Sequence, residues 1–385
     1  MERRQFLKLG GMAASAGLVY PPFMPDGEDK RPDKFSETIN FTTDGLGLTP
    51  REYSSQLNQL AAEAKINADY YSRGGTVEEL EQQFARLLGK ESAVFMPTGT
   101  LANHIAVRKL AGENRRVLVQ AESHLYNDSG DGATVMSGLN LIPLAPDQAT
   151  LTLDEVKRWV ERSSSGRVET RIGAISIESP VRRKRHEMFD FDEMNKISAY
   201  AREHNIGLHL DGARLFNIPH HSGRRIEEYT SLFDTVYVSL WKCFNATSGA
   251  MLAGSKQFTE GLFHVRRMFG GSLPQAWPLI AVAAQYAENY LEAYSSAWKT
   301  ADGFLSIVQK DDRFRAEKIA NGSSIFKMSV MGIDPEKFLQ KLRERNIILS
   351  PPDKNAGAFW MTVNTTLNRV SPEELANSFV LSAGA

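Results

Sequence analysis

Seven short apolar runs, spaced along the middle of the chain, place the strongest constraint on its fold. They lie at residues 93–96, 116–120, 140–144, 172–177, 207–210, 235–239 and 250–253. Several are almost continuously hydrophobic, which is typical of strands buried on both faces of a parallel sheet. Segments of helical length separate many of them, at residues 76–88, 101–111, 153–163 and 192–204. This alternation predicts a three-layer α/β domain with a mostly parallel sheet between its helices.

The C-terminal part of the chain follows a different pattern. A long helical stretch is predicted around residues 275–294. Shorter segments that suit an α+β arrangement follow it, at residues 324–330, 334–345 and 358–364. The chain has 385 residues, which exceeds what one hydrophobic core usually fills. We therefore expect a large domain over residues 35–294 and a small α+β domain over residues 295–385.

The N-terminal segment is predicted to lie outside the fold. Residues 1–16 read MERRQFLKLGGMAASA, with Arg3 and Arg4 ahead of an uncharged, mildly apolar run. This string resembles a twin-arginine export signal that is cleaved after about Ala16. The run is too short and too rich in small residues to span a bilayer stably. Residues 1–34 are thus expected to be a signal peptide and linker of an exported, periplasmic protein; the alternative is the amphipathic first helix of a cytoplasmic one.

Composition excludes several classes of partner and site. Lys and Arg total 45 against 46 Asp and Glu, a formal net charge of −1, which gives no electrostatic footprint for nucleic acid or an anionic membrane. Cys243 is the only cysteine, so an intramolecular disulfide and a cysteine-rich metal site are both excluded. No glycine-rich dinucleotide fingerprint or P-loop is present, and we expect no metal.

Two charged residues follow neighbouring predicted strands. Asp211, within His-Leu-Asp-Gly-Ala-Arg, closes the run at 207–210, and Lys242 follows the run at 235–239. In open α/β folds, ligands bind at the carboxyl ends of the strands. A lysine after an apolar segment is desolvated, which favours a Schiff base with pyridoxal 5'-phosphate. The Asp211 carboxylate then suits the protonated pyridine nitrogen of that cofactor.

A strand-to-helix junction further upstream has the form of a phosphate cup. Thr98, Gly99 and Thr100 connect the run at 93–96 to the predicted helix at 101–111. Backbone N–H groups at a helix N-terminus, together with the helix dipole, bind phosphate groups. Ser239, three residues before Lys242, is predicted to reach the same phosphate. Taken alone, the Thr-Gly-Thr sequence also fits a simple helix cap and turn.

Several stretches together resemble a known family. They are Thr43-Asp44, Ser123-His124 and residues 76–81, 88–91, 97–103, 211–217 and 266–271. The chain is similar, over nearly its whole mature length, to the threonine aldolase or β-eliminating lyase family of fold-type I pyridoxal-phosphate enzymes. The resemblance implies a three-layer α/β/α large domain, a small α+β C-terminal domain and a homodimer or homotetramer.

The resemblance also implies roles for individual residues. It makes Lys242 the lysine that binds the cofactor, Asp211 the partner of the pyridine nitrogen, and His124 the imidazole stacked on the ring. It assigns Arg214 and Thr43 to substrate binding. It places Arg267 near the cofactor phosphate, with donation across a dimer interface as one arrangement. Asp211 and Arg214 also fit a structural ion pair, which is the commoner fate of such neighbours.

Two departures from the family pattern bear on specificity. Val181 stands where the family carries a histidine that contacts the β-hydroxyl of threonine, and no Gly-Gly pair follows. Near the C-terminus, Phe359 and Trp360 stand where a carboxylate-binding arginine is usual. A bidentate arginine contact contributes about 1.5–3 kcal/mol. We therefore expect a more apolar pocket and poor cleavage of threonine.

The sequence thus predicts a pyridoxal-phosphate-dependent lyase that acts on an amino acid by threonine-aldolase-like Cα–Cβ cleavage, giving glycine and an aldehyde. Lys242, His124 and Asp211 are the predicted catalytic residues, with His124 as the base for the β-hydroxyl proton. Two alternatives stay open. One is β-elimination or transamination on the same cofactor, and the other is a cofactor-binding protein that has lost turnover.

Overall fold

A seven-stranded sheet forms the centre of the computed structural model, which describes residues 37–353 and 357–384. Its strands are β2 (Ser92–Met96), β3 (Arg116–Gln120), β4 (Asn140–Leu144), β5 (Ile172–Glu178), β6 (Gly207–Asp211), β7 (Thr235–Ser239) and β8 (Ala250–Gly254). They are ordered β2-β8-β7-β6-β5-β3-β4. β8 pairs antiparallel with β2 and β7, and the other neighbours are parallel. The prediction of a mostly parallel sheet is confirmed.

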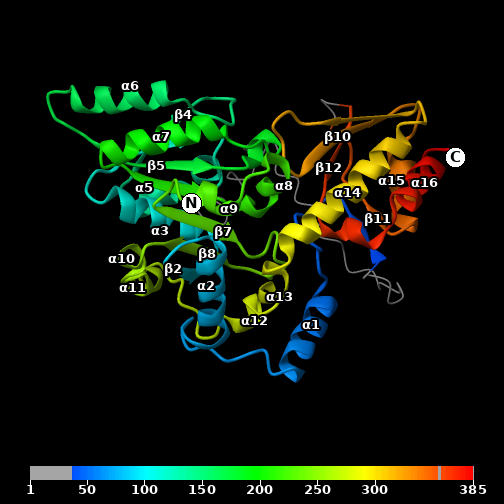
Figure 1. Cartoon of the computed structure of the whole chain (residues 1–385), viewed down its shortest axis with the longest axis horizontal. Coiled ribbons are helices and arrows are strands. Elements are labelled where there is room, and N and C mark those ends of the chain that lie inside the picture. The colour runs from blue at the N-terminus through cyan, green and yellow to red at the C-terminus, as the bar shows by residue number, and fades with distance from the viewer. Residues whose placement is uncertain (1–36, 354–356, 385) are drawn as a thin grey trace, which may run out of the picture. The chain divides into compact units, whose positions relative to one another are not determined.

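Helices cover both faces of this sheet (Figure 1). The apolar side chains of α2 (Gly75–Leu87), α6 (Leu153–Ser164) and α7 (Phe191–Glu203) share one buried cluster with Leu208 and Leu210 of β6. The opposite face is covered by α3 (Gly99–Ala111), which packs against β2, β7 and β8. Because side chains alternate along a strand, His209 and Asp211 of β6 face α3.

Further helices precede, connect or follow the strands of the large sheet. They are α1 (Pro50–Ala62), α4 (His124–Asn127), α5 (Gly132–Ser137), α8 (Ile218–Ser222), α9 (Ile226–Thr230), α10 (Lys256–Thr259) and α11 (Leu262–Met268), with 3₁₀ turns η3 (Arg182–Lys184) and η4 (Leu215–Asn217). Helix starts follow local chemistry. Thr152 and Glu155, for example, form a reciprocal capping box at α6, which satisfies otherwise free N–H groups.

The long helical stretch predicted around residues 275–294 is helical but interrupted. The chain there forms α12 (Trp277–Ile280) and α13 (Ala283–Ala287), and the long helix α14 (Tyr290–Val308) begins later. The carbonyl groups of Pro278 and Leu279 accept hydrogen bonds from Tyr53 Oη, and Thr247 N also donates to Leu279. These distant donors take acceptors that a continuous helix uses for its own next turn. The interruption is therefore a tertiary effect.

The C-terminal region carries a second, antiparallel sheet in the order β12-β10-β9. Its elements are β9 (Phe314–Lys318), β10 (Ile325–Val330), α15 (Pro335–Glu344), β12 (Phe359–Thr362), η5 (Thr365–Arg369) and α16 (Pro372–Ala383). A parallel pair joins β1 (Ile39–Asn40) to β11 (Ile347–Ile348). The α+β pattern is confirmed. The boundary at residues 294 and 295 falls inside α14, and the two-domain division stays a prediction.

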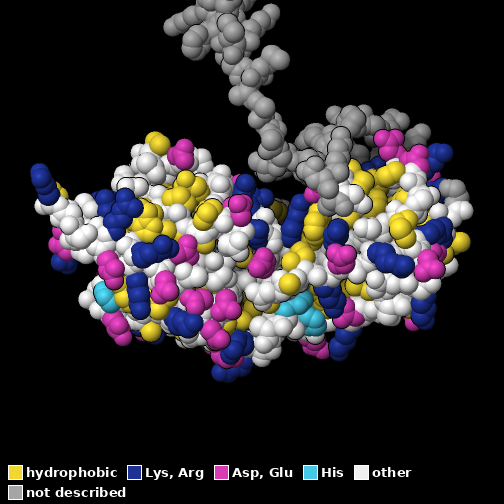
Figure 2. All heavy atoms as spheres, turned by 90° about the horizontal axis from the view of Figure 1, so that it is seen from above, with side chains coloured by type: hydrophobic (Ala, Val, Ile, Leu, Met, Phe, Trp, Pro, Cys, Tyr) yellow, Lys and Arg dark blue, Asp and Glu magenta, His cyan; other side chains and the backbone are white. Residues whose placement is uncertain are grey.

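Other expectations concern surface and termini. The predicted leader and linker at residues 1–34 lie outside the described residues. No helix in the described part of the chain is long and apolar enough to cross a membrane. Lys and Arg side chains mix with Asp and Glu side chains over the face drawn in Figure 2, in keeping with the near-zero net charge.

A largely buried histidine on α8 is expected to make the folded protein less stable in acid. Burial lowers the pKa of His221 to about 3, and the neighbouring His220 adds to the shift. Because the pKa of His221 is lower in the folded protein than in the unfolded chain, the neutral ring stabilises the fold. This contribution to the free energy of unfolding is complete above the unfolded pKa near 6.5 and is lost as the pH falls toward 3. Between about pH 7.5 and about pH 5, we expect this group to account for ~2 kcal/mol of lost unfolding free energy.

Denaturant unfolding at the two pH values measures this contribution. His221→Gln, which does not titrate, is expected to lose correspondingly less stability on acidification. An equal loss in the variant and the unaltered protein would contradict the prediction.

Candidate active site

A cavity of about 190 Å³ opens where the carboxyl ends of the parallel strands meet. Residues from five separate segments line it. They are Thr98, Gly99, Thr100, His124, Glu178, Arg182, Asp211, Ala213, Arg214, Tyr237, Trp241, Lys242 and Ser248. Seven of the ten residues singled out from the sequence are among them, and Ser239, Arg267 and Thr43 are not.

The lysine of the cavity is buried, with 8% of its surface exposed. Burial lowers the pKa of the Lys242 amine to about 8, and the positive charge of Arg214 acts in the same direction. The carboxylates of Asp44 and Asp211 oppose this shift. An amine with such a pKa is partly unprotonated near neutral pH, which makes it a competent nucleophile toward a carbonyl carbon.

The carboxylate of Asp211 is held at both of its oxygens. Asn103 Nδ2 donates to Oδ2 at 2.5 Å, and the backbone N–H of Ala213 donates to Oδ1 at 3.1 Å. The residue is 4% exposed. A buried carboxylate fixed in this way suits a protonated ring nitrogen, because its orientation is set before any ligand binds.

Glu178 ties two loops of the cavity together, and the sequence analysis did not single it out. Its carboxylate accepts hydrogen bonds from the backbone N–H of His124 at 2.6 Å and from that of Arg182 at 2.8 Å. Burial raises the pKa of Glu178 to about 7, although both hydrogen bonds oppose that shift. Its position one residue beyond the predicted strand, at a carboxyl end, is the signal that marks it.

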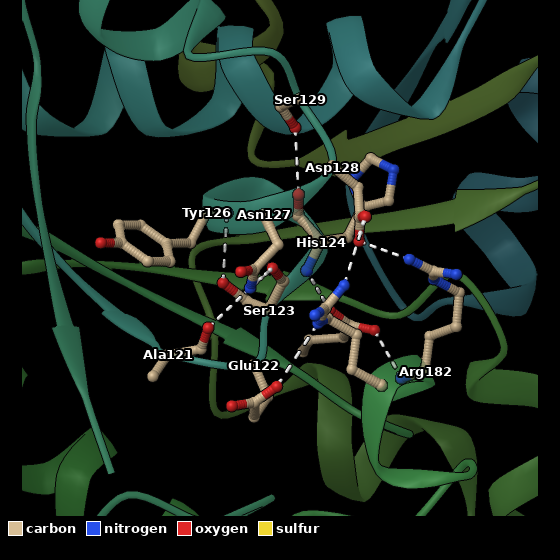
Figure 3. A network of polar contacts seen from close by, with 11 residues as sticks. Ala121, Glu122, Ser123, His124, Tyr126, Asn127, Asp128, Ser129 and Arg182 are labelled. Carbon is tan, nitrogen blue, oxygen red and sulfur yellow. Dashed lines mark hydrogen bonds and ion pairs between the residues drawn. The ribbon is translucent and has the colours of Figure 1, made fainter. Parts of the chain in front are cut away.

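The histidine of the cavity stands at the start of α4, next to a pair of opposite charges. Figure 3 shows the Arg182 guanidinium turned toward Asp128, and these groups are 2.5 Å apart. His124 Nδ1 is buried without a hydrogen-bond partner among the described residues. Burial lowers the pKa of His124. Its imidazole is therefore a neutral group with a free polar atom, available to a ligand.

The strand-to-helix junction fits a phosphate group. A Cβ atom on Gly99 would lie 2.0 Å from Tyr237 Oη, so only glycine fits this close approach. Thr98 caps α3 by accepting a hydrogen bond from Leu101 N at 3.1 Å. Ser239 Oγ is buried and has no partner among the described residues. A helix N-terminus with an unsatisfied hydroxyl nearby is a donor set that suits an anion.

Arg214 is held by a residue far away in the sequence. Its Nε and Nη2 atoms donate to the two oxygens of Asp44 at 2.7 and 2.9 Å. Both side chains are largely buried. Although burial opposes it, the Arg214 guanidinium holds the pKa of Asp44 well below its usual range. Arg214 also lines the cavity, and a guanidinium is a group that binds carboxylates.

Two predicted residues do not line the cavity of this chain. Thr43 Oγ1 donates to the carbonyl of Gly45 at 2.8 Å. The Arg267 guanidinium stands over the ring of Tyr71, 5.0 Å from its centroid. The roles of Thr43 in substrate binding and of Arg267 near the cofactor phosphate stay predictions.

The residues that depart from the family pattern do not line the cavity in the structure. Val181 is wholly buried, and its N–H and carbonyl groups bond to Glu187 and His186. Phe359 packs against Phe338 in the core, and neither it nor Trp360 lines the cavity. The expected apolar wall is therefore not formed by these residues, because the alternation of β12 turns Phe359 into the core, while the Trp360 ring lies under the Arg185 guanidinium and its Nε1 donates to Asp353.

A histidine that the sequence analysis missed approaches the site instead. His186 is buried, its Nδ1 is 2.7 Å from Ser324 Oγ, and it lies within electrostatic range of Asp44 and Arg214. Arg185 and His186 both have left-handed backbone conformations, with φ of 54° and 62°. Such conformations cost about 1–3 kcal/mol each in residues other than glycine. The sequence signal for His186 is that no Gly-Gly pair follows Val181, so residues other than glycine occupy this segment.

Glycine substitutions at these neighbouring positions separate strain from function. Both Arg185→Gly and His186→Gly relieve backbone strain. If Arg214 binds the substrate carboxylate as predicted, we expect only His186→Gly to raise KM for the amino acid substrate, by about tenfold, because it opens space beside the Asp44–Arg214 pair. Steady-state kinetics measure the effect, with Arg185→Gly as the control. Equal KM values in the two variants would contradict it.

Comparison with known proteins places this geometry in a family. The family model described as "Beta-eliminating lyase" matches residues 52–322. The chain is 28% identical to the low specificity L-threonine aldolase of Saccharomyces cerevisiae over 264 residues, which cover 68% of this chain and 67% of the yeast protein.

Two solved structures share the fold. A Listeria monocytogenes protein assigned as an L-allo-threonine aldolase is 29% identical, with a TM-score of 0.71 over 91% of this chain and 98% of that one. A serine palmitoyltransferase variant from S. paucimobilis, with a bound aldimine of pyridoxal phosphate and myriocin, has a TM-score of 0.63 at 15% identity and covers 90% of this chain and 86% of that one. The second match concerns the fold alone. The chain belongs to the beta-eliminating lyase family of fold-type I, pyridoxal-phosphate-dependent enzymes.

Proposed function

We propose that this chain is a pyridoxal-phosphate-dependent lyase that cleaves the Cα–Cβ bond of a β-hydroxy amino acid, giving glycine and an aldehyde. The observation that carries the proposal is Lys242, a buried amine with a pKa near 8 that shares one cavity with Asp211 and the strand-to-helix junction at Gly99. The similarity to the yeast threonine aldolase supports the reaction type.

The residues of the cavity divide into those that hold the cofactor and those that hold the substrate. Lys242, Asp211, His124, Ser239 and the junction at residues 98–100 would hold pyridoxal phosphate. When bound, this cofactor supplies a conjugated ring that takes up the electron pair of the broken bond. The Asp211 carboxylate keeps a proton on the ring nitrogen, because a charge partner favours the ionised form.

Arg214 and His124 act on the amino acid. Arg214 binds the substrate carboxylate through the guanidinium edge that Asp44 leaves free. His124 takes the proton of the β-hydroxyl as the bond to Cβ breaks, since a neutral imidazole near its operating pH is an effective base. Its lowered pKa keeps it in the neutral form.

A rival reaction on the same cofactor has one supporting observation. Among the described residues, His124 is the only histidine that lines the cavity, and β-elimination or transamination needs only the lysine as a proton carrier. A cofactor-binding protein without turnover is the second rival. Both are distinguished by their products.

Incubation of the purified protein with a panel of amino acids tests the proposal. Borohydride reduction first establishes that the cofactor is bound through Lys242. We then expect release of glycine and an aldehyde from β-hydroxy amino acids. Release of a keto acid with ammonia indicates elimination, and transfer of the amino group to an added keto acid indicates transamination. A bound cofactor with no product from any substrate supports the loss of turnover.

We also propose that the active protein is a homodimer or homotetramer. Tyr70, which is 76% exposed, stacks edge-on against Tyr71, and the Arg267 guanidinium stands over the other ring. Exposed aromatic groups and arginines are enriched at interfaces between subunits, and Arg267 makes no ion pair with the residues that the structure describes. Analytical ultracentrifugation of the unaltered protein and of Tyr70→Ser measures the assembly.

The N-terminal string supports a proposal of export to the periplasm by the twin-arginine route, which accepts folded proteins and thus a loaded cofactor. We expect replacement of Arg3 and Arg4 by lysine to retain the protein in the cytoplasm. Cell fractionation and N-terminal sequencing measure this result. Unaltered protein found only in the cytoplasm, with residues 1–16 intact, would show that the cytoplasmic alternative holds.

A further inference from the structure

A chain of buried hydrogen bonds leads from Asp211 away from the cavity. Asn103 Nδ2 donates to Asp211 Oδ2 at 2.5 Å. Asn103 Oδ1 is 2.8 Å from His209 Nε2, and His209 Nδ1 is 2.8 Å from Thr235 Oγ1. We name Asn103, His209 and Thr235 the Asp211 relay. Each of its three side chains is at most 1% exposed, and none of them lines the cavity.

The fold brings the relay together from three elements. His209 precedes Asp211 by two residues on β6, so both side chains point to the face that α3 covers. Asn103 comes from α3, the helix that begins at the proposed phosphate site. Thr235 starts β7, and its Cα is paired with that of His209. The relay therefore links the orientation of Asp211 to the placement of α3.

Donor and acceptor rules fix where the protons lie. An ionised Asp211 only accepts, so Asn103 turns its NH₂ group toward it and its carbonyl oxygen toward His209. That oxygen needs a donor, which places the ring proton of His209 on Nε2. Nδ1 then accepts from the Thr235 hydroxyl. Burial also lowers the pKa of His209 to about 4, which agrees with a neutral ring.

We propose that the Asp211 relay positions the Asp211 carboxylate against the cofactor ring and keeps it an acceptor, so that Asn103 and His209 are positioning residues for the reaction. This inference rests on the proposed function. An apolar set of side chains of similar size would fill the same space. Stability alone does not call for polar groups here, because a paired buried set gains only modest stability and an unpaired one is costly. What the relay supplies beyond packing is one defined proton arrangement behind Asp211.

The test compares two buried histidines, each hydrogen-bonded to a hydroxyl group. His209 is bonded to Thr235, and His104, the neighbour of Asn103 on α3, has its Nε2 2.6 Å from Ser137 Oγ. The variants are His209→Phe and, as the control, His104→Phe. Asn103→Leu breaks the relay next to Asp211. His209→Gln retains a donor toward Asn103 and tests rescue.

The first readout needs no turnover. The absorption of the lysine-linked cofactor is titrated with pH in each purified holoprotein, with no substrate present. We expect the apparent pKa to shift by about one unit in His209→Phe and Asn103→Leu, because the ring nitrogen loses part of its charge partner. His104→Phe and His209→Gln are expected to titrate as the unaltered protein does.

The second readout is the split between kcat and KM. We expect kcat to fall by about 10- to 100-fold in His209→Phe, as for other groups that orient a reactive residue, with little change in KM. If His209→Phe and His104→Phe titrate alike and lose activity alike, the relay serves packing alone and the inference is overturned. If Asn103→Leu does not fold, the comparison of His209→Phe with His209→Gln still tests whether the relay positions Asp211.

Failure of cofactor binding at Lys242, on which the proposed function rests, gives a different result, whereas products other than glycine and an aldehyde overturn only the reaction type. If the cofactor does not bind there, the unaltered protein carries no reducible adduct at Lys242, and no titration is observed in any variant. A normal titration in the unaltered protein that is unchanged in His209→Phe overturns only the relay.

Discussion

Lys242→Ala is expected to remove the borohydride-reducible cofactor adduct and to lower turnover by about a thousandfold or more. The reason lies in the burial of this amine. Its pKa near 8 leaves a fraction unprotonated at neutral pH, and the cavity contains no other lysine among the described residues. Mass spectrometry of the reduced, digested protein locates the adduct, and steady-state assays measure the loss.

Lys90 provides a matched control for this substitution. It is also partly buried, burial lowers its pKa, and its Nζ donates to the carbonyl of Phe233. Because it lies outside the cavity, Lys90→Ala is expected to keep the adduct and the turnover. An adduct mapped to any lysine other than Lys242 would show that the assignment is wrong.

Asp211→Asn is expected to lower turnover by about a hundredfold or more while the cofactor still binds. The amide has nearly the shape of the carboxylate, but it carries no charge to keep the ring nitrogen protonated. Binding persists because Lys242, His124 and the strand-to-helix junction are untouched. Absorption spectroscopy measures the bound cofactor, and the rate of glycine release measures turnover.

Asp234→Asn is the control for a lost aspartate charge near β6. Asp234 Oδ2 accepts a hydrogen bond from Leu208 N at 2.7 Å, and the residue does not line the cavity. We expect this variant to turn over normally. Unchanged turnover in Asp211→Asn as well would exclude the role of Asp211 at the ring nitrogen.

Much of the fold was predictable because its signals are local. The runs at 116–120, 140–144 and 235–239 coincide with β3, β4 and β7 residue for residue. Strands buried on both faces must be apolar at nearly every position, so a continuous apolar run in the sequence indicates such a strand. The breaks in the helical stretch at 275–294 were not predicted, for the opposite reason. Its acceptors are taken by Tyr53 and Thr247, whose positions no local pattern reveals.

The candidate site, like the fold, was predictable from the sequence only in part. The sequence placed Lys242 and Asp211 at one sheet edge, because the carboxyl ends of parallel strands always meet there. It did not indicate that Asp44 holds Arg214 across 170 residues, or that Asn103 reaches Asp211 across 108. It also missed Glu178 and His186.

The sequence by itself therefore determined which segments are strands, which edge of the sheet carries the reactive groups and which family motifs are present. These depend on burial, on local turn chemistry and on strand direction. Only the tertiary structure decided the partner of each buried polar group. That choice depends on the order of strands in the sheet and on which face of α3 meets β6, and neither is encoded at any single position.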